Sequence, residues 1–223
     1  MYMKKILLII VVGMFIILYC YGFSFKDSYT NVLEKENMEN YIYVGVMSSQ
    51  EAELEFKRME EALALSPIVI KVKAIGPFEY YAREGIQQVE VLEVMKGNLP
   101  YKGEKIYITS NKRKMIDTGQ FFFVGTGFTN FMNEGKEYLI FVEGLADCRG
   151  VDDNVYRLYD DSINICPIFS YENVNNTIIR EDETIYGCIP YTKVKNNEIF
   201  IDSKEALEEF LLVKKRIMLD YNN

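Results

Sequence analysis

Residues 66–76 read SPIVIKVKAIG and decide the fold class of this chain. Between Pro67 and Gly76, apolar residues alternate with a second set of residues that includes Lys71 and Lys73. A period of two is typical of a β-strand that buries one face. The segment therefore predicts a strand, and the rest of the chain is interpreted outward from it.

Several downstream segments repeat the strand pattern. KEYLIFVE at residues 136–143 is the most apolar of them, and we expect it to lie centrally in a sheet, because a strand that is covered on both faces shows little polar alternation. The other predicted strands are 88–95, 105–109 and 121–124, with weaker signals at 155–159 and 163–168 and closing strands at 184–194 and 198–201.

Amphipathic helices are predicted on both sides of this β-rich region. Ser48 and Glu51 have the spacing of a capping box, and apolar residues follow at helical spacing, which predicts a helix over 49–65. Near the C-terminus, Asp202 with Glu205 predicts a second helix start. The apolar face expected for that helix is formed by Leu207, Phe210, Leu211, Ile217 and Met218.

The strand run at 66–76, together with VEVLEVMKG at 89–97, KIYI at 105–108 and MNEGKEYLIF at 132–141, resembles small exported OB-fold proteins of Gram-positive bacteria. These proteins in turn resemble the netrin-like modules of tissue metalloproteinase inhibitors. The resemblance covers roughly residues 49–145. It implies a mainly β fold with a five-stranded OB-like Greek-key barrel, with one helix before it and another at the C-terminus.

Metalloproteinase inhibition is not implied by this resemblance. In the inhibitors, a cysteine at the mature N-terminus reaches the zinc of the target protease. The stretch from Phe25 to Asn40 contains no cysteine, so the residues that would do this are missing. What the resemblance implies is therefore a fold and not an activity.

The N-terminus carries an apolar segment of about twenty residues, long enough for a helix to cross a hydrocarbon layer about 30 Å thick. We therefore expect residues 1–25 to be a signal-anchor or signal peptide, 26–48 a solvated stalk and 49–223 an OB-like domain with flanking helices. The expected location is the cell membrane, with a single transmembrane helix and the C-terminal domain outside.

The fate of the N-terminal segment stays open among three alternatives. It could be retained as an anchor, or cleaved after Ser24, which would make the protein secreted. Cys20 has the position of a bacterial lipoprotein cysteine, although the large Tyr19 precedes it where such sites need a small residue.

Composition excludes several classes of function. The chain contains no histidine, which rules out Ser-His-Asp and Cys-His hydrolases and metal sites with imidazole ligands. Its 33 acidic and 25 basic residues give a formal net charge of −8, which disfavours nucleic acid as a partner. We expect no cofactor and no bound metal.

Three cysteines follow the N-terminal segment and are candidates for a disulfide. Cys148, Cys166 and Cys188 allow at most one bridge among themselves, and Cys148 with Cys166 is slightly preferred because an Asp-rich segment separates them. Buried thiols that act as small apolar side chains are the other interpretation. No Cys-x-x-Cys pair exists, so a thioredoxin-like centre is not expected.

Short patterns that resemble functional motifs are interpreted as structural. Asp-Thr-Gly at 117–119 is a single copy of a sequence that aspartic proteases use in pairs, and Gly-Thr-Gly at 125–127 lacks the third glycine of a nucleotide fingerprint. Five loop aspartates lack the spacing of a calcium loop and are expected to be solvated. These aspartates are Asp147, Asp152, Asp153, Asp160 and Asp161.

The chain contains 17 tyrosines, more than one core is expected to absorb. Some could form an aromatic binding face, because tyrosine combines a large contact area with a polar tip; the candidates are Tyr80, Tyr81, Tyr156 and Tyr159. Half-buried strand tyrosines are the alternative.

The sequence therefore predicts a membrane-tethered extracytoplasmic binding module without catalytic activity. The expected partner is a protein, a peptide or a cell-wall polymer, engaged through the barrel face and the loops between residues 145 and 184. Two alternatives are a carboxylate-dependent hydrolase and a structural component of the cell envelope.

Overall fold

The computed structural model describes residues 12–19, 42–81, 84–98, 100–118, 121–148 and 154–221, without the side chains of Tyr81, Glu84 and Asp117. Contacts divide the chain into two units, Met1–Met38 and Glu39–Asn223, and each is described by itself. The larger unit begins before residue 49, so strand β1 (Ile42–Gly45), which we predicted to be part of the stalk, belongs to the folded body.

The larger unit is mainly β, as predicted, and its sheet is mixed. Its remaining strands are β2 (Ile68–Tyr81), β3 (Glu84–Lys96), β4 (Lys105–Asp117), β5 (Phe122–Val124), β6 (Glu137–Leu145), β7 (Val155–Leu158), β8 (Ile168–Ser170) and β9 (Cys188–Pro190). Its helices are α3 (Ser49–Ala64), α4 (Tyr191–Val194) and α5 (Lys204–Asp220), with a 3-10 helix η1 (Glu181–Glu183).

Five of these strands pair in a closed ring. β2 pairs antiparallel with β3, and β3 pairs antiparallel with β4. β4 pairs in parallel with β7, which pairs antiparallel with β6, and β6 returns antiparallel to β2. One apolar cluster draws residues from all five strands, including Val72, Val89, Ile106, Ile140 and Leu158. The alternating residues that predicted these strands thus point into a shared core.

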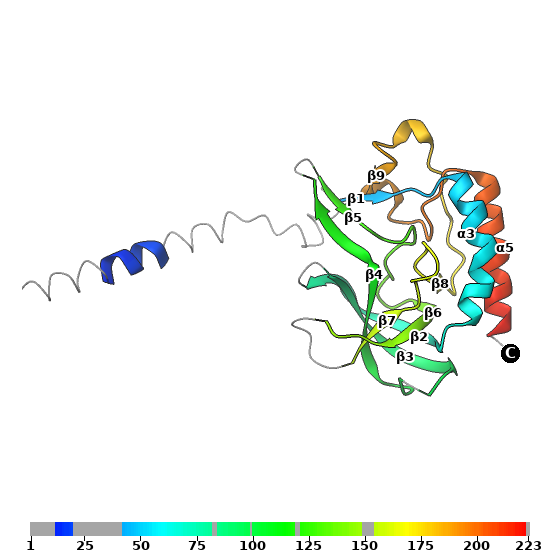
Figure 1. Cartoon of the computed structure of the whole chain (residues 1–223), viewed down its shortest axis with the longest axis horizontal. Coiled ribbons are helices and arrows are strands. Elements are labelled where there is room, and N and C mark those ends of the chain that lie inside the picture. Colours follow the sequence, from blue (N-terminus) through cyan, green and yellow to red (C-terminus); the bar gives the residue numbers. More distant parts are fainter. Residues whose placement is uncertain are drawn as a thin grey trace, which may run out of the picture. The chain divides into compact units, whose positions relative to one another are not determined.

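A second core lies between the outer side of β2 and β6 and the two long helices. Phe56 of α3 and Phe210 of α5 pack there with Leu139 and Phe141 of β6. Figure 1 shows α3 and α5 side by side on one side of the sheet. β6 is therefore covered on both faces, which explains why KEYLIFVE carries no polar alternation.

The first predicted helix start is confirmed, and the second is displaced by one residue. The Ser48 hydroxyl accepts a hydrogen bond from the Glu51 N–H, and the Glu51 carboxylate accepts one from the Ser48 N–H. At α5 the N-cap is Ser203, whose hydroxyl accepts from the Ala206 N–H, whereas we predicted Asp202. The Asp202 carboxylate instead accepts from the backbone of Ser49 at the start of α3.

The predicted closing strand at 184–194 is wrong over most of its length. The chain makes a tight turn between Ile185 and Cys188, runs for three residues as β9 beside β1, and then enters the short helix α4. Pro190 ends the strand, because it has no N–H for a further ladder bond.

The predicted single-pass membrane location is contradicted. Within the N-terminal segment the structure describes a helix over residues 12–19, and no described helix combines the length and apolar character that a bilayer span requires. Cys20 and Ser24, on which the lipidation and cleavage alternatives depend, lie outside the described residues.

Candidate functional site

A groove of about 470 Å³ opens between α5 and the chain that leaves β8. Its lining combines apolar side chains with charged ones. The residues that line it are Ser170, Tyr171, Glu172, Asn173 and Val174 on one side and Leu211, Lys214, Lys215, Met218 and Leu219 of α5 on the other. The first wall lies within the loop region from 145 to 184 that we predicted to engage a partner.

The groove wall on α5 follows from the spacing of residues along the helix. Phe210, Val213 and Ile217 are buried in the second core. Leu211 and Leu219 are eight residues apart, so they share another face of the helix, and they are 43% and 55% exposed. The prediction that Leu211 belongs to the buried face is therefore wrong, because α5 carries two apolar faces and only the face of Phe210, Val213 and Ile217 is buried.

The opposite wall is fixed by hydrogen bonds that arise far away in the sequence. The amide oxygen of Asn176 accepts from the N–H groups of Glu198 and Ile199, at 2.7 and 3.1 Å. Lys71 lies over the ring of Tyr171 at 4.5 Å from its centroid. These contacts hold the segment after β8 at a set distance from α5, so the groove is formed before any ligand arrives.

A buried ion pair forms the base of the groove. The Lys214 ammonium donates to both carboxylate oxygens of Glu198, at 2.7 and 2.6 Å, and the Ser170 N–H donates to the same carboxylate at 2.9 Å. Burial raises the pKa of Glu198, and Lys214 acts in the opposite direction. The pair fastens α5 to the end of β8, and it stabilises the fold only while both partners are present.

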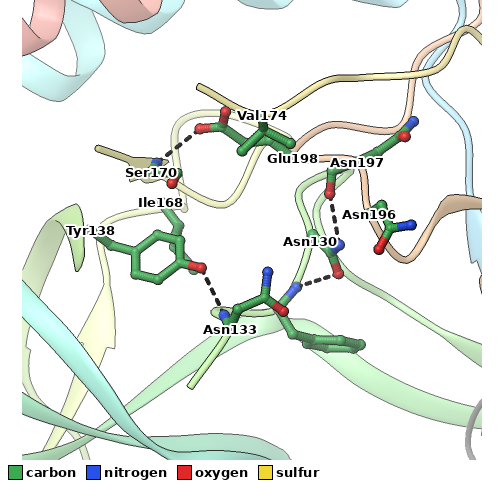
Figure 2. A pocket seen from close by; sticks show the side chains of 10 residues that line it. Asn130, Asn133, Tyr138, Ile168, Ser170, Val174, Asn196, Asn197 and Glu198 are labelled. Carbon is green, nitrogen blue, oxygen red and sulfur yellow. Dashed lines mark hydrogen bonds between the residues drawn. The ribbon is translucent and has the colours of Figure 1, made fainter. Parts of the chain in front are cut away.

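A small polar cavity of about 30 Å³ lies on the other side of Glu198. Figure 2 shows Tyr138, Asn133, Asn130 and Asn197 around it, with Tyr138 accepting a hydrogen bond from the Asn133 N–H at 2.7 Å. The volume suits a water molecule rather than an organic ligand, and the lining offers the polar partners that a buried water needs. The cavity therefore has the size and polarity for a water molecule, and the groove is large enough for a larger ligand.

The four tyrosines proposed from the sequence do not share one exposed face. Tyr156 is 3% exposed and belongs to the core enclosed by the five-strand ring. Tyr159 packs against the second core, and Tyr80 is half-buried, with burial raising its pKa. The side chain of Tyr81 lies outside the described part of the structure. Tyr156 and Tyr159 thus pack in or against a core, and Tyr80 is a half-buried strand tyrosine, as in the alternative interpretation.

The cysteines do not form the preferred disulfide. Cys166 is a buried thiol without a bridge, so the pairing of Cys148 with Cys166 is absent. Cys148 is buried beside Ile86 and Val155. Cys188 is half-buried, and its thiol contacts the carbonyl oxygen of Tyr186 at 3.7 Å. Their positions fit the interpretation of thiols as small buried side chains.

A second buried polar cluster escaped the sequence analysis. The hydroxyl of Ser110 on β4 donates to the carboxyl group of Asp160 and lies 3.2 Å from the Cys166 sulfur. Asp160 is fully buried, although we predicted it to be a solvated loop acid, and burial raises its pKa. The contacts among these three side chains connect β4 to the chain after β7. Each side chain is at most 3% exposed, so the cluster offers no access to a substrate.

The two short motifs are described in part, because Gly119 and the side chain of Asp117 lie outside the described residues. Asp117 ends β4 opposite Phe122, and the Thr118 hydroxyl donates to the Phe121 carbonyl at 2.7 Å. Gly127 has a φ of +57° and its carbonyl accepts from the Cys166 N–H, so it serves a close backbone contact. Over the described ranges, no three Cys, Asp or Glu side chains gather as a metal site would require.

The acids at the groove bear on carboxylate-dependent hydrolysis, the enzymatic alternative. Such a reaction needs two acids that converge on one substrate position. Glu172 at the rim is paired with Lys136 at 2.6 Å, and Glu198 is buried behind Lys214.

No protein-family model matches the chain, and no curated protein sequence matches it.

Proposed function

We propose that this chain is a binding module built on an OB-type barrel and that its ligand is an amphipathic segment of another protein. The fold part of the proposal is supported by the order of the ring strands. β6, the fourth ring strand, lies beside β2, the first, and β7 closes the ring between β6 and β4. This order corresponds to a five-stranded Greek key.

The groove beside α5 is the proposed binding site, and the observation that carries it is the second apolar face of this helix. Leu211 and Leu219 remain exposed in a groove that is already formed. A peptide helix or turn with apolar side chains at matching spacing buries them, in the manner of helix-in-groove recognition. Figure 1 shows α5 at the edge of the body.

Charge at the groove indicates an acidic residue in the ligand. Lys71 pairs with Glu137, Lys136 with Glu172 and Lys214 with Glu198. Lys215 lines the groove and has no ion-pair partner among the described residues. A carboxylate in the ligand would therefore find one exposed ammonium beside the apolar side chains.

The outer face of the ring is less suited to this role. Along β2 and β3, Lys71 faces Glu93 and Lys73 faces Glu90, and Glu90 in turn faces Lys105 of β4. Opposite charges across neighbouring strands satisfy one another. On the barrel face that we predicted to engage the partner, most charges therefore face an opposite charge on a neighbouring strand. The proposal accordingly assigns the ligand to the groove.

The test is selection of random displayed peptides on the immobilised chain, followed by measurement of their affinity for two variants. Leu211→Asp places a carboxylate in the groove, whereas Leu54→Asp changes a leucine of α3 that is 64% exposed. We expect the selected peptides to carry spaced apolar residues and an acidic residue, and to bind Leu211→Asp at least about tenfold more weakly. Binding to Leu54→Asp should equal that of the wild type.

Two results would contradict the proposal. Selected peptides that bind the two variants equally would place the site elsewhere. A chain that binds isolated cell-wall polymer and none of the displayed peptides would show a polymer-binding protein instead.

Both leucines are exposed, so each substitution should change the free energy of unfolding by less than about 0.5 kcal/mol, which a urea titration checks.

A further inference from the structure

Tyr186 lies at the tip of a two-residue turn and is almost completely exposed, at 96%. Ile185 and Cys188 exchange both backbone hydrogen bonds, at 2.8 and 3.0 Å. Tyr186 and Gly187 between them have φ values of 53° and 72°. Positive φ at both central positions is the geometry of a type I′ turn, in which asparagine or glycine is normally preferred at the first position.

The strain at Tyr186 has no compensation in the fold. Two other described residues that are not glycine have positive φ, Phe128 and Asn154. Phe128 packs against the second core, and asparagine adopts this conformation readily. Tyr186 does not bury its ring, and tyrosine is not a residue type that readily adopts a positive φ. A strained residue that contributes no packing indicates a role outside folding.

The turn is held rigidly in the larger unit. The Val46 N–H donates to the Gly187 carbonyl at 2.9 Å, and Gly45 is the register partner of Cys188 in the β1–β9 pair. On the other side, the Thr184 hydroxyl donates to the Glu181 carbonyl at 2.9 Å. The tyrosine is therefore presented at a fixed position, and its binding would lose little backbone entropy.

The surroundings of the ring define the chemistry of what it fits. Ile185 beside it is 49% exposed, and the preceding 3-10 helix contributes Glu181, Asp182 and Glu183. Arg180 offsets part of this charge through contacts of 3.5 and 3.7 Å. The tip is thus an aromatic and aliphatic anchor with an acidic collar.

We propose that Tyr186 is the anchor of a protein-docking surface, distinct from the groove, whose partner has an apolar pocket with a basic rim. Tyrosine is enriched at such anchors because a rigid ring buries a large area and its hydroxyl finds a polar partner. The acidic collar selects lysine or arginine at the rim of that pocket. The proposal does not depend on the function of the groove.

The strain premise is tested in the purified chain without any partner. Tyr186→Gly removes the penalty of positive φ, and we expect the melting temperature to rise by about 2 °C. Tyr101→Gly is the control, because Tyr101 is also exposed, at 67%, but is not among the residues with positive φ. That control should not raise the melting temperature. A decrease with Tyr186→Gly would show that the ring contributes to folding and would overturn the argument.

The partner is tested by replacing Tyr186 with a photo-cross-linking phenylalanine analogue in living cells, with the same replacement at Tyr101 as the control. We expect a covalent adduct at position 186 only, attached to a peptide that contains lysine or arginine. The adduct should decrease at least fivefold when Glu181→Lys and Asp182→Lys are combined. An adduct that survives this charge reversal, an adduct with a second copy of this chain, or no adduct at position 186 would each refute the proposal.

Discussion

Glu198 and Asp160 are both buried carboxyl groups, but they are held in different ways. Glu198 accepts from the Lys214 ammonium and from a backbone N–H, whereas Asp160 accepts from the Ser110 hydroxyl beside a thiol. An ammonium at hydrogen-bonding distance favours the charged carboxylate much more than a hydroxyl does. Burial raises the pKa of both carboxyl groups, and the main contact that acts against this shift is the Lys214 ammonium at Glu198 and the Ser110 hydroxyl at Asp160. The base of the groove therefore depends on a contact with a charged partner, while the interior of the body relies on a contact with a neutral one.

The largest effect is expected when the charged contact is broken. Lys214→Met leaves Glu198 buried without its cation, and the free energy of unfolding at neutral pH should fall by about 3 kcal/mol in a urea titration. The loss should shrink as the pH falls from neutral towards about 4.5, because Glu198 without its cation takes up a proton in the folded state, and it should change little below that value, where the unfolded state is protonated as well. Because α5 also forms one wall of the groove, peptide binding should weaken with it.

The matched control removes both members of the pair. Lys214→Met combined with Glu198→Gln removes both charges and keeps an amide oxygen that can accept from the Ser170 N–H, so stability should recover to within about 1 kcal/mol of the wild type. If the double variant is as unstable as Lys214→Met alone, the loss comes from the packing of the lysine stem and not from an uncompensated charge.

A smaller effect is expected at the second carboxyl group. Ser110→Ala removes the hydroxyl that donates to Asp160, whose other oxygen already has no hydrogen-bond partner among the described residues. The free energy of unfolding should fall by about 2 kcal/mol. Ser162→Ala, two residues after Asp160 and exposed, should change it by less than about 0.5 kcal/mol. Equal values for the two serine variants would contradict a buried network.

Elements whose signals are local could be predicted from the sequence. The capping box of Ser48 and Glu51 depends on two residues three positions apart, and the period-two strands depend on neighbours in the chain. The error at α5 is of the same kind, since Asp202 and Ser203 are both good caps and only the fold brings Asp202 to the start of α3. The turn at Tyr186 was missed because it lacks the asparagine that usually marks this geometry.

The groove and the two buried carboxyl groups could not be predicted, because they depend on residues far apart in the chain. Ser110 and Asp160 are fifty positions apart, and Tyr171 and Leu211 are forty. A lysine or glutamate in the sequence is expected at the surface, so Lys214 and Glu198 gave no signal of burial. The prediction of an exposed Tyr156 was wrong for a different reason: the signal is local, but alternation along β7 is equally compatible with an exposed face and with a core.

The smallest expected effect concerns the pH dependence that Asp160 adds. Burial raises the pKa of its carboxyl group above 3.8, so the folded state retains the proton longer than the unfolded state does. This contribution to stability is fully present below that value and is lost as the pH rises through the folded pKa. Asp160→Asn keeps the shape and can still accept from Ser110, but it does not titrate. The difference in unfolding free energy between wild type and Asp160→Asn should therefore shift against the wild type between pH 4 and pH 7, measured by urea titrations across that range. A constant difference would mean that Asp160 is charged in the folded protein throughout, and the contrast with Glu198 would then disappear.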